Sequence, residues 1–307
     1  MSSVCSPFLR RRRLVVGLAH ILRQRNVTGI IGRGSHHYPS INRYGFVLPI
    51  RSIQTQSQPI EKVYTKLSNR EHILRRPGMY IGSTDDVTLS ECWLYDLNNN
   101  CMQMKNDFSY SPGFLKVVDE ILVNACDQKF RGAGTTKIDV TFNDSEIVIE
   151  NNGEGIPVQI HKHAGEYLPQ MLFGSLYTGS NFHDDDEQKQ IVGGRHGYGA
   201  KLTNLFSHEF TLETAFAGIY FRQTWRDNMG EFCYDDKDTV SDFTGEDFTR
   251  ITFKPDLARL CPNNNGSSKF SKESKEAILK RCVDVAGTAD IEVCVNGTQL
   301  SIQGWNE

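Results

Sequence analysis

Residues 193–201 read Gly193-Gly194-Arg195-His196-Gly197-Tyr198-Gly199-Ala200-Lys201, and the helical pattern Lys201-Leu202-Thr203-Asn204-Leu205-Phe206 follows directly. Glycines allow backbone N–H groups to surround phosphate oxygens, and a helix start aims further N–H donors at the same anion. The spacing differs from G-x-x-x-x-G-K-[ST] and from a G-x-G-x-x-G that follows a strand. The stretch therefore predicts a phosphate-binding loop of another architecture.

A second segment, residues 117–128, reads Val-Val-Asp-Glu-Ile-Leu-Val-Asn-Ala-Cys-Asp-Gln and predicts an amphipathic helix. Its apolar stripe consists of Val118, Ile121, Leu122 and Ala125. Another face carries Glu120, Asn124 and either Asp127 or Gln128, aligned along the helix axis. A carboxylate can hold a water and an amide oxygen can hold a hydrated Mg²⁺, which suits hydrolysis of a phosphoanhydride. An ordinary solvated helix face is the alternative interpretation.

A third segment predicts a hairpin of two strands, 137–142 and 146–150, joined by Asn143-Asp144. The second strand leads into Asn151-Asn152-Gly153-Glu154-Gly155-Ile156-Pro157. The Asn151 amide in this turn can read the edge of a base, and glycines keep the chain close to a ring. A plain β-turn with tolerant asparagines explains the same residues.

Taken together and in this order, the three segments resemble the GHKL ATPase family, which includes gyrase, MutL, the ATP-dependent heat-shock chaperones and sensor histidine kinases. The resemblance narrows to the ATPase region of eukaryotic type II DNA topoisomerase in residues 70–83, 119–127, 174–186 and 193–207. It covers essentially residues 59–307. It implies an α+β chain with the GHKL (Bergerat) fold, a two-layer α/β sandwich with a mixed β-sheet.

The resemblance also implies ATP and Mg²⁺ as ligands and assigns roles to residues. Glu120 would be the general base, Asn124 would hold Mg²⁺ and contact ATP, and Asn151 would contact adenine. Tyr64 would reach the nucleotide of a second subunit when a homodimer closes on ATP. Further ATP contacts are implied for Gln128, Gly179, Ser180, Asn181, Gly194, Arg195, His196, Gly197, Tyr198, Gly199, Ala200 and Lys201.

The sequence departs from the family pattern at several positions. Gln128 and His196 stand where the family has asparagine, Gly179 replaces a serine, and Glu154 replaces a residue that is basic in many relatives. No Gln-Thr-Lys transducer tripeptide follows Lys201, and loss of one preorganised donor typically costs ~10² to 10³ in rate. We therefore expect nucleotide binding with slow or negligible turnover, and DNA contacts only through regions that this chain lacks.

Two other functions fit the same residues. The first is a non-catalytic nucleotide-binding module that dimerises with, or regulates, a full-length topoisomerase. The second is another GHKL enzyme, of the mismatch-repair or chaperone type, and the Arg-Pro-Gly-Met-Tyr-Ile-Gly segment at residues 76–82 argues against it. Turnover, and its stimulation by DNA, would separate these alternatives.

Charge divides the chain near residue 57. Residues 1–57 carry nine arginines and no Asp or Glu, whereas the remainder has 25 basic and 37 acidic residues, a net charge of −12. We interpret 1–57 as an organellar transit peptide, with the mitochondrion as the expected location and the nucleus as the alternative. Residues 58–307 would be the GHKL domain, with 58–83 as a dimerisation arm. No apolar run is long enough to cross a membrane, so no membrane partner is expected.

The remaining sequence is rich in strand patterns. Strands are predicted at 209–215, 219–225, 231–234 and 249–254, followed by a helix at 274–286 that Gly287 caps and a hairpin at 291–302. The eight cysteines show no C-x-x-C spacing, which indicates reduced thiols. The histidines at 161, 163 and 183 have no paired ligand spacing, so a metal site there is not expected.

Overall fold

A computed structural model gives the fold, and it describes residues 64–176, 197–233 and 240–302. These residues belong to one compact unit, Glu61–Glu307. The basic extension 1–57 lies outside the described residues, so its interpretation as a transit peptide stays a prediction.

Two helices, α2 (Asn69–Arg75) and α3 (Gly78–Ile81), precede a hairpin of β1 (Val87–Asp96) and β2 (Cys101–Tyr110). The long helix α4 (Pro112–Phe130) follows, and the next elements are β3 (Lys137–Phe142), β4 (Ile147–Asn152), α5 (Leu168–Gly174) and α6 (Gly199–Leu205). The remaining strands are β5 (Ser207–Phe216), β6 (Ile219–Arg226), β7 (Glu231–Cys233), β8 (Val240–Asp242), β9 (Phe248–Pro255), β10 (Glu292–Val295) and β11 (Thr298–Gln299). Helices α7 (Leu257–Leu260) and α8 (Lys272–Ala289) lie between β9 and β10.

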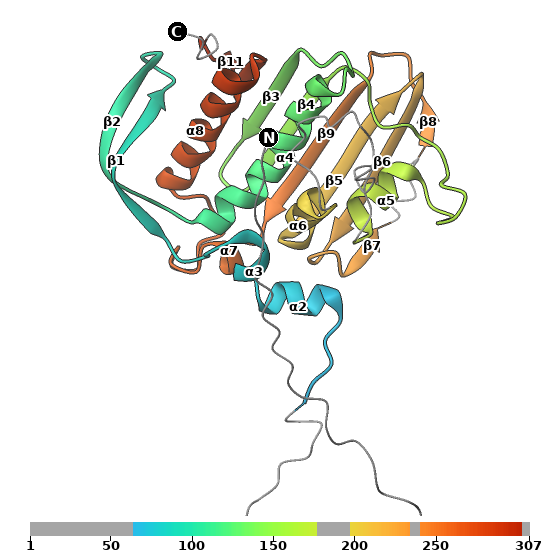
Figure 1. Cartoon of the computed structure of the whole chain (residues 1–307), viewed down its shortest axis with the longest axis horizontal. Helices are drawn as coiled ribbons and strands as arrows, with labels where there is room; N and C mark the ends of the chain where they lie inside the picture. Colours follow the sequence, from blue (N-terminus) through green and yellow to red (C-terminus); the bar gives the residue numbers. More distant parts are fainter. Residues whose placement is uncertain (1–63, 177–196, 234–239, 303–307) are drawn as a thin grey trace, which may run out of the picture. The chain divides into compact units, whose positions relative to one another are not determined.

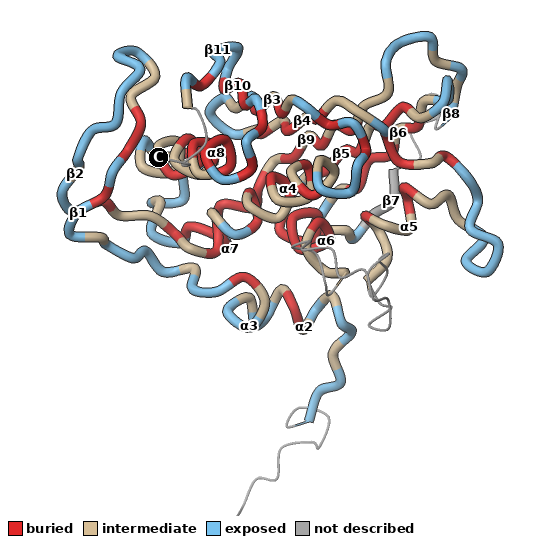
Figure 2. Tube along the Cα trace, turned by 45° about the horizontal axis from the view of Figure 1, so that its top comes forward, coloured by how far each residue is buried: buried red, intermediate tan, exposed pale blue. Residues whose placement is uncertain are grey.

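The main sheet has the order β11-β10-β3-β4-β9-β5-β6-β7, and β8 also pairs with β6. The β10–β3 pair is parallel and the other pairs of described strands are antiparallel, so the sheet is mixed. Helices α4, α6 and α8 cover one face of it (Figure 1). The buried residues gather between these two layers (Figure 2). The predicted two-layer α/β sandwich is confirmed.

Helix α4 is the central element of the helical layer. Its N-terminus is set by Ser111, whose hydroxyl accepts a hydrogen bond from the Phe114 N–H at 3.2 Å, and by Pro112 in the first helical position. The whole predicted stripe is buried, and Val118 and Leu122 are fully inaccessible. Burying such side chains stabilises the fold by about 1.5–3 kcal/mol each. The polar row of α4 is therefore held at a fixed angle to the sheet.

Apolar and charged residues alternate along the strands, so one face of the sheet is apolar and the other is charged. Ile149 pairs with Ile251, and Ile251 with Leu212, in one buried row that faces the helices. The adjacent row on the other face is charged: Arg250 contacts Glu150 at 2.6 Å and Glu213 at 3.6 Å. Cross-strand ion pairs thus cover the face of the sheet opposite the described helices.

The β1–β2 hairpin forms a separate two-stranded sheet beside α8 (Figure 1). A small core of Cys92, Leu94, Phe108 and Ala277 joins the hairpin to that helix. Lys105 adds an ion pair to Glu276 at 2.5 Å. Sequence analysis did not predict this hairpin, although apolar residues flank the turn-forming Asn98-Asn99-Asn100.

Three predicted boundaries need correction. Helix α8 does not end at Gly287 but continues to Ala289, where Asp290 adopts the left-handed conformation with φ 49°. Asn151 lies in strand β4, paired with Ile138 and Thr249, and not in the following turn. Strand β11 comprises Thr298–Gln299 alone, so the closing hairpin is shorter than expected.

The N-terminal arm is anchored on the domain by its two short helices. Ser68 and Glu71 form a capping box at the start of α2. Ile73 of α2 and Ile81 of α3 are buried in the main core. Among the residues that the structure describes, no helix has both the length and the apolar character needed to cross a membrane.

Gly155 supplies a test of this packing. A Cβ atom there would lie 1.9 Å from the Ala215 carbonyl oxygen and 2.7 Å from the Thr214 hydroxyl oxygen, both in β5. We expect Gly155→Ala to lower the free energy of unfolding by about 1–3 kcal/mol, because the backbone must move. Urea unfolding measures this change. Gly78→Ala is the matched control, since nothing lies within 4 Å of its added Cβ, and an equal loss in both variants would contradict the assignment.

Candidate nucleotide-binding site

The carboxylate of Glu120 lies against the first residue of α6. An added Cβ at Gly199 would stand only 2.0 Å from the Glu120 Oε2 atom, so glycine alone fits at this contact. The Lys116 ammonium pairs with Glu120 from one turn earlier on α4. The structure thus brings the predicted base next to the last part of the glycine-rich stretch.

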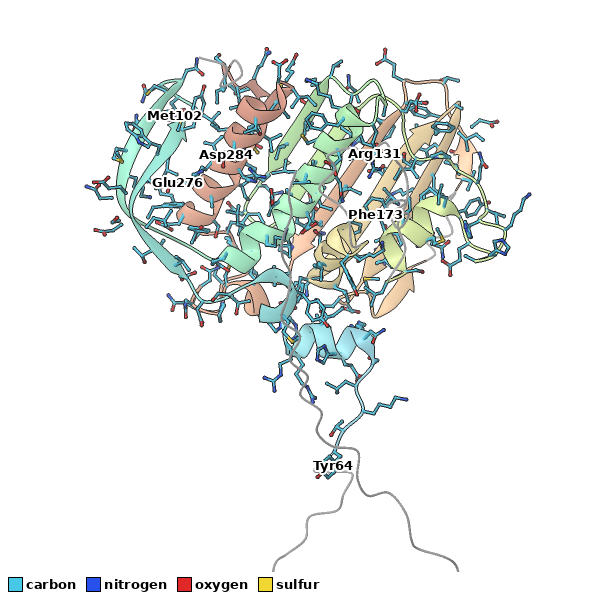
Figure 3. All side chains as sticks on the ribbon, viewed as in Figure 1. Tyr64, Met102, Arg131, Phe173, Glu276 and Asp284 are labelled. Carbon is cyan, nitrogen blue, oxygen red and sulfur yellow. The ribbon has the colours of Figure 1, made fainter. Side chains whose placement is uncertain are left out.

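A cavity of about 40 Å³ lies further along the same face of α4. Three predicted site residues, Asn124, Gln128 and Asn151, line it together. Its other walls are Ile121, Ala125, Ile149, Ile156, Phe173, Thr249 and Ile251. Figure 3 labels Phe173 on α5. Of the two candidates Asp127 and Gln128, Gln128 lines the cavity, whereas Asp127 is buried away from it; the ATP contact of Gln128 stays a prediction.

Asn151 belongs to a polar row that crosses three strands. It pairs with Thr249 of β9, which in turn pairs with Thr214 of β5. Its Nδ2 donates to the Asn152 carbonyl at 3.0 Å, and the two threonine hydroxyls are 3.2 Å apart. Sequence analysis missed Thr249 because the β4–β9 pairing joins residues about a hundred positions apart, although the alternation in 248–255 places it on the inner face.

Lys201 is almost fully buried, at 3% exposure, and its Nζ donates to the Gly197 carbonyl at 2.7 Å. Gly197 itself has φ +64°, a conformation that glycine adopts without strain. Burial lowers the pKa of Lys201 to about 8. Helix α6 is tied to α4 by the Thr203 hydroxyl, which donates to the Val117 carbonyl at 2.7 Å. Lys201 therefore fixes the shape of the loop end, and its contact with phosphate stays a prediction.

The remaining predicted contact residues fall partly within the described part of the chain. Gly179, Ser180, Asn181, Gly194, Arg195 and His196 lie outside the described residues. Tyr64 is 75% exposed on the arm, where Figure 3 labels it, and Tyr198 and Ala200 lie at the start of α6. Glu154 is exposed and lines a separate depression with Glu246 and Asp247, so its charge does not enter the cavity beside Asn151.

Comparison with known proteins agrees with this geometry. Residues 110–258 match the family described as histidine kinase-, DNA gyrase B- and HSP90-like ATPase. DNA topoisomerase 2 of Drosophila melanogaster is 42% identical to this chain over 253 residues, which cover 81% of this chain and 17% of that protein. DNA topoisomerase 2 top-2 of Caenorhabditis elegans is 40% identical over 258 residues, which cover 82% of this chain and 16% of that protein. The crystal structure of the ATPase region of Saccharomyces cerevisiae topoisomerase II superposes with a TM-score of 0.73 and 39% identity, over 80% of this chain and 64% of that one.

This chain belongs to the GHKL ATPases, in the type II DNA topoisomerase branch. The predicted family and fold are thereby confirmed, and neither the mismatch-repair nor the chaperone alternative gains support. The chain spans about one sixth of the length of the curated topoisomerases that it matches. The part they share is the ATPase domain, which here contains α4, the glycine-rich segment and Asn151.

The lowered pKa of Lys201 predicts a pH dependence of stability. Between pH 8 and 10.5 the unfolded chain keeps the Lys201 proton while the folded chain loses it, so the free energy of unfolding rises with pH. We expect the wild type to gain stability across this window relative to Lys201→Met, by at most about 1.4 kcal/mol per pH unit. Urea unfolding of both proteins from pH 7 to 10.5 measures the difference. A constant or shrinking gap would contradict the burial of a titrating lysine.

Proposed function

We propose that this chain binds ATP with Mg²⁺ and that Glu120 supports hydrolysis of the terminal phosphoanhydride. The observation that carries the proposal is one row of side chains on α4. Glu120 meets Gly199 at one end, and Asn124 and Gln128 reach the cavity of Asn151 at the other. At 1.5 Å per residue this row is about 12 Å long. That length suits a nucleotide with its base at Asn151 and its phosphates at the glycine-rich loop.

The residues have complementary roles in such a site. Asn151 and Thr249 present polar atoms among apolar walls, which suits a flat base with one hydrogen-bonding edge. Glu120 would orient water and accept its proton, and the paired Lys116 would compensate its charge until then.

The side chains in the site are compatible with bound Mg²⁺. Among the described residues no cluster of three His, Cys, Asp or Glu side chains is arranged to hold a metal. Mg²⁺ commonly needs only one or two protein oxygens beside phosphates and water, and the Asn124 amide oxygen offers one. When bound, Mg²⁺ would neutralise charge that develops on the phosphates.

We also propose a function for the complete protein, and this proposal rests on the family to which the chain belongs. Relatives named DNA topoisomerase 2 support a role in ATP-driven dimer closure around DNA, with Tyr64 reaching the nucleotide of the second subunit. DNA would be contacted by regions outside this sequence. The arginine-rich, acid-free residues 1–57 support import into the mitochondrion or another organelle, and the nucleus is the alternative. A non-hydrolysing nucleotide-binding regulator remains the rival function.

Substitution of the base tests hydrolysis. We expect Glu120→Gln to bind ATP and Mg²⁺ with affinity close to that of the wild type, and to lower steady-state hydrolysis by about 10² to 10⁴, because general-base catalysis is lost. Phosphate release and equilibrium titration measure the two quantities. Glu91→Gln, an exposed glutamate of β1, is the control. Binding without turnover in all three proteins would favour the regulator, whereas no binding would reject the site.

Substitution of Asn151 tests the orientation of the nucleotide. We expect Asn151→Ala to weaken ATP binding by roughly 1–3 kcal/mol, because the buried edge of the base loses its partner. Preference for ATP over GTP should fall in the same variant, as measured by competition titration. Asn106→Ala on the exposed part of β2 is the control. Unchanged affinity and base preference would place the base elsewhere.

A further inference from the structure

The turn between β6 and β7 has an unusual backbone. Three consecutive residues other than glycine, Asp227, Asn228 and Met229, adopt left-handed φ values of 50°, 57° and 59°. Each is unfavourable for an L-residue, and such strain persists only where surrounding contacts enforce it. The contacts that enforce this turn come from two directions.

The first set of contacts ties the turn to α6. The Asn228 side chain is buried, and its Nδ2 donates to the Leu205 carbonyl at 2.9 Å and to Asp256 Oδ2 at 3.3 Å. Leu205 is the last residue of α6, where carbonyls lack partners within the helix. The same helix begins at Gly199 against Glu120. Asn228 therefore holds the far end of the helix whose first residue lies at the proposed phosphate site.

The second set of contacts ties the turn to the N-terminal arm. The Arg70 guanidinium of α2 donates from Nε to the Asn228 carbonyl at 2.7 Å and from Nη2 to the Asp227 carbonyl at 2.6 Å. The left-handed run places these two carbonyls side by side for one guanidinium. Gly230 leaves room for it, since a Cβ atom there would lie 2.9 Å from Arg70 Nη2. Asn228 thus contacts α6 through its side chain and the arm through its main chain.

We propose that the 227–230 turn couples the nucleotide site to the N-terminal arm, with Asn228 and Arg70 as positioning residues. A displacement of α6 on nucleotide binding would move Asn228, and the two carbonyls would move with it. Hydrogen bonds to carbonyls weaken steeply with misalignment, so the hold on Arg70 would change. The proposal rests on the proposed function, because it takes a nucleotide as the ligand that displaces α6. Beyond that function, the proposal states how a bound nucleotide would change the position of α2, the helix that follows Tyr64: through α6, Asn228 and Arg70.

Amide hydrogen exchange of α2 in the full chain tests the proposal. Exchange is compared without ligand and with Mg²⁺ plus a non-hydrolysable ATP analogue, and the affinity for the same analogue is titrated in parallel. The wild type should show at least a threefold nucleotide-dependent change in exchange over residues 69–75. Asn228→Gly keeps the left-handed turn but removes both side-chain bonds. It should bind the analogue within about threefold of the wild type and lose the change.

Arg70→Gln provides the second variant, and its α2 amides should exchange faster with and without nucleotide. Two controls match the substitutions. Asn265→Gly changes an exposed left-handed asparagine, and Arg75→Gln changes an exposed arginine of the same helix. Both should behave as the wild type does. The coupling would be overturned if α2 of the wild type showed no nucleotide-dependent change in exchange. It would also be overturned if Asn228→Gly kept that change, or if the controls lost it to the same extent. The parallel titration decides separately whether nucleotide binds at all.

Discussion

The burial of one stripe of α4 against the sheet is the constraint on which the rest of the structure depends. Val118, Ile121, Leu122 and Ala125 fix the rotation of the helix, and a rotation of one residue, about 100°, would expose them. The same rotation sets where Glu120 and Asn124 point. Packing energy and site geometry are therefore not separate properties of this helix, because the apolar residues orient the polar ones.

Close backbone approach is the second constraint on the site. Gly199 touches the Glu120 carboxylate, and Gly155 touches the backbone of β5, so two elements distant in sequence reach their partners only without side chains. Lys201 and Thr203 then fasten α6 to its own loop and to α4. Helix α6 is thus tied both to the end of the glycine-rich segment and to α4, so a displacement of the segment is transmitted to the helix.

Local patterns predicted much of this fold, and long-range pairing accounts for most of what they did not. The residues of α4, β3 and α6 were evident from periodicity because their faces differ sharply in polarity. The cavity walls Thr249 and Phe173 were not, since neither carries a motif and each reaches Asn151 only through the order of the strands and the docking of α5. The prediction that Gly287 caps α8 was wrong, because the sequence alone does not distinguish a glycine inside a helix from a glycine just beyond its C-terminus. Asp290 instead takes the left-handed position.

The ends of the sheet have a consequence for self-association. At one edge β11 comprises Thr298–Gln299 alone, and at the other β7 and β8 span three residues each on the same partner strand, β6. Neither edge of the described sheet offers a long row of unpaired N–H and C=O groups, which is the template that edge-to-edge strand addition requires. Two copies of this domain cannot readily join by extending their main sheets into one. Any association of two copies through the described residues would then use surfaces other than the edges of the main sheet, and would depend on those surfaces rather than on the exposed backbone of these edges.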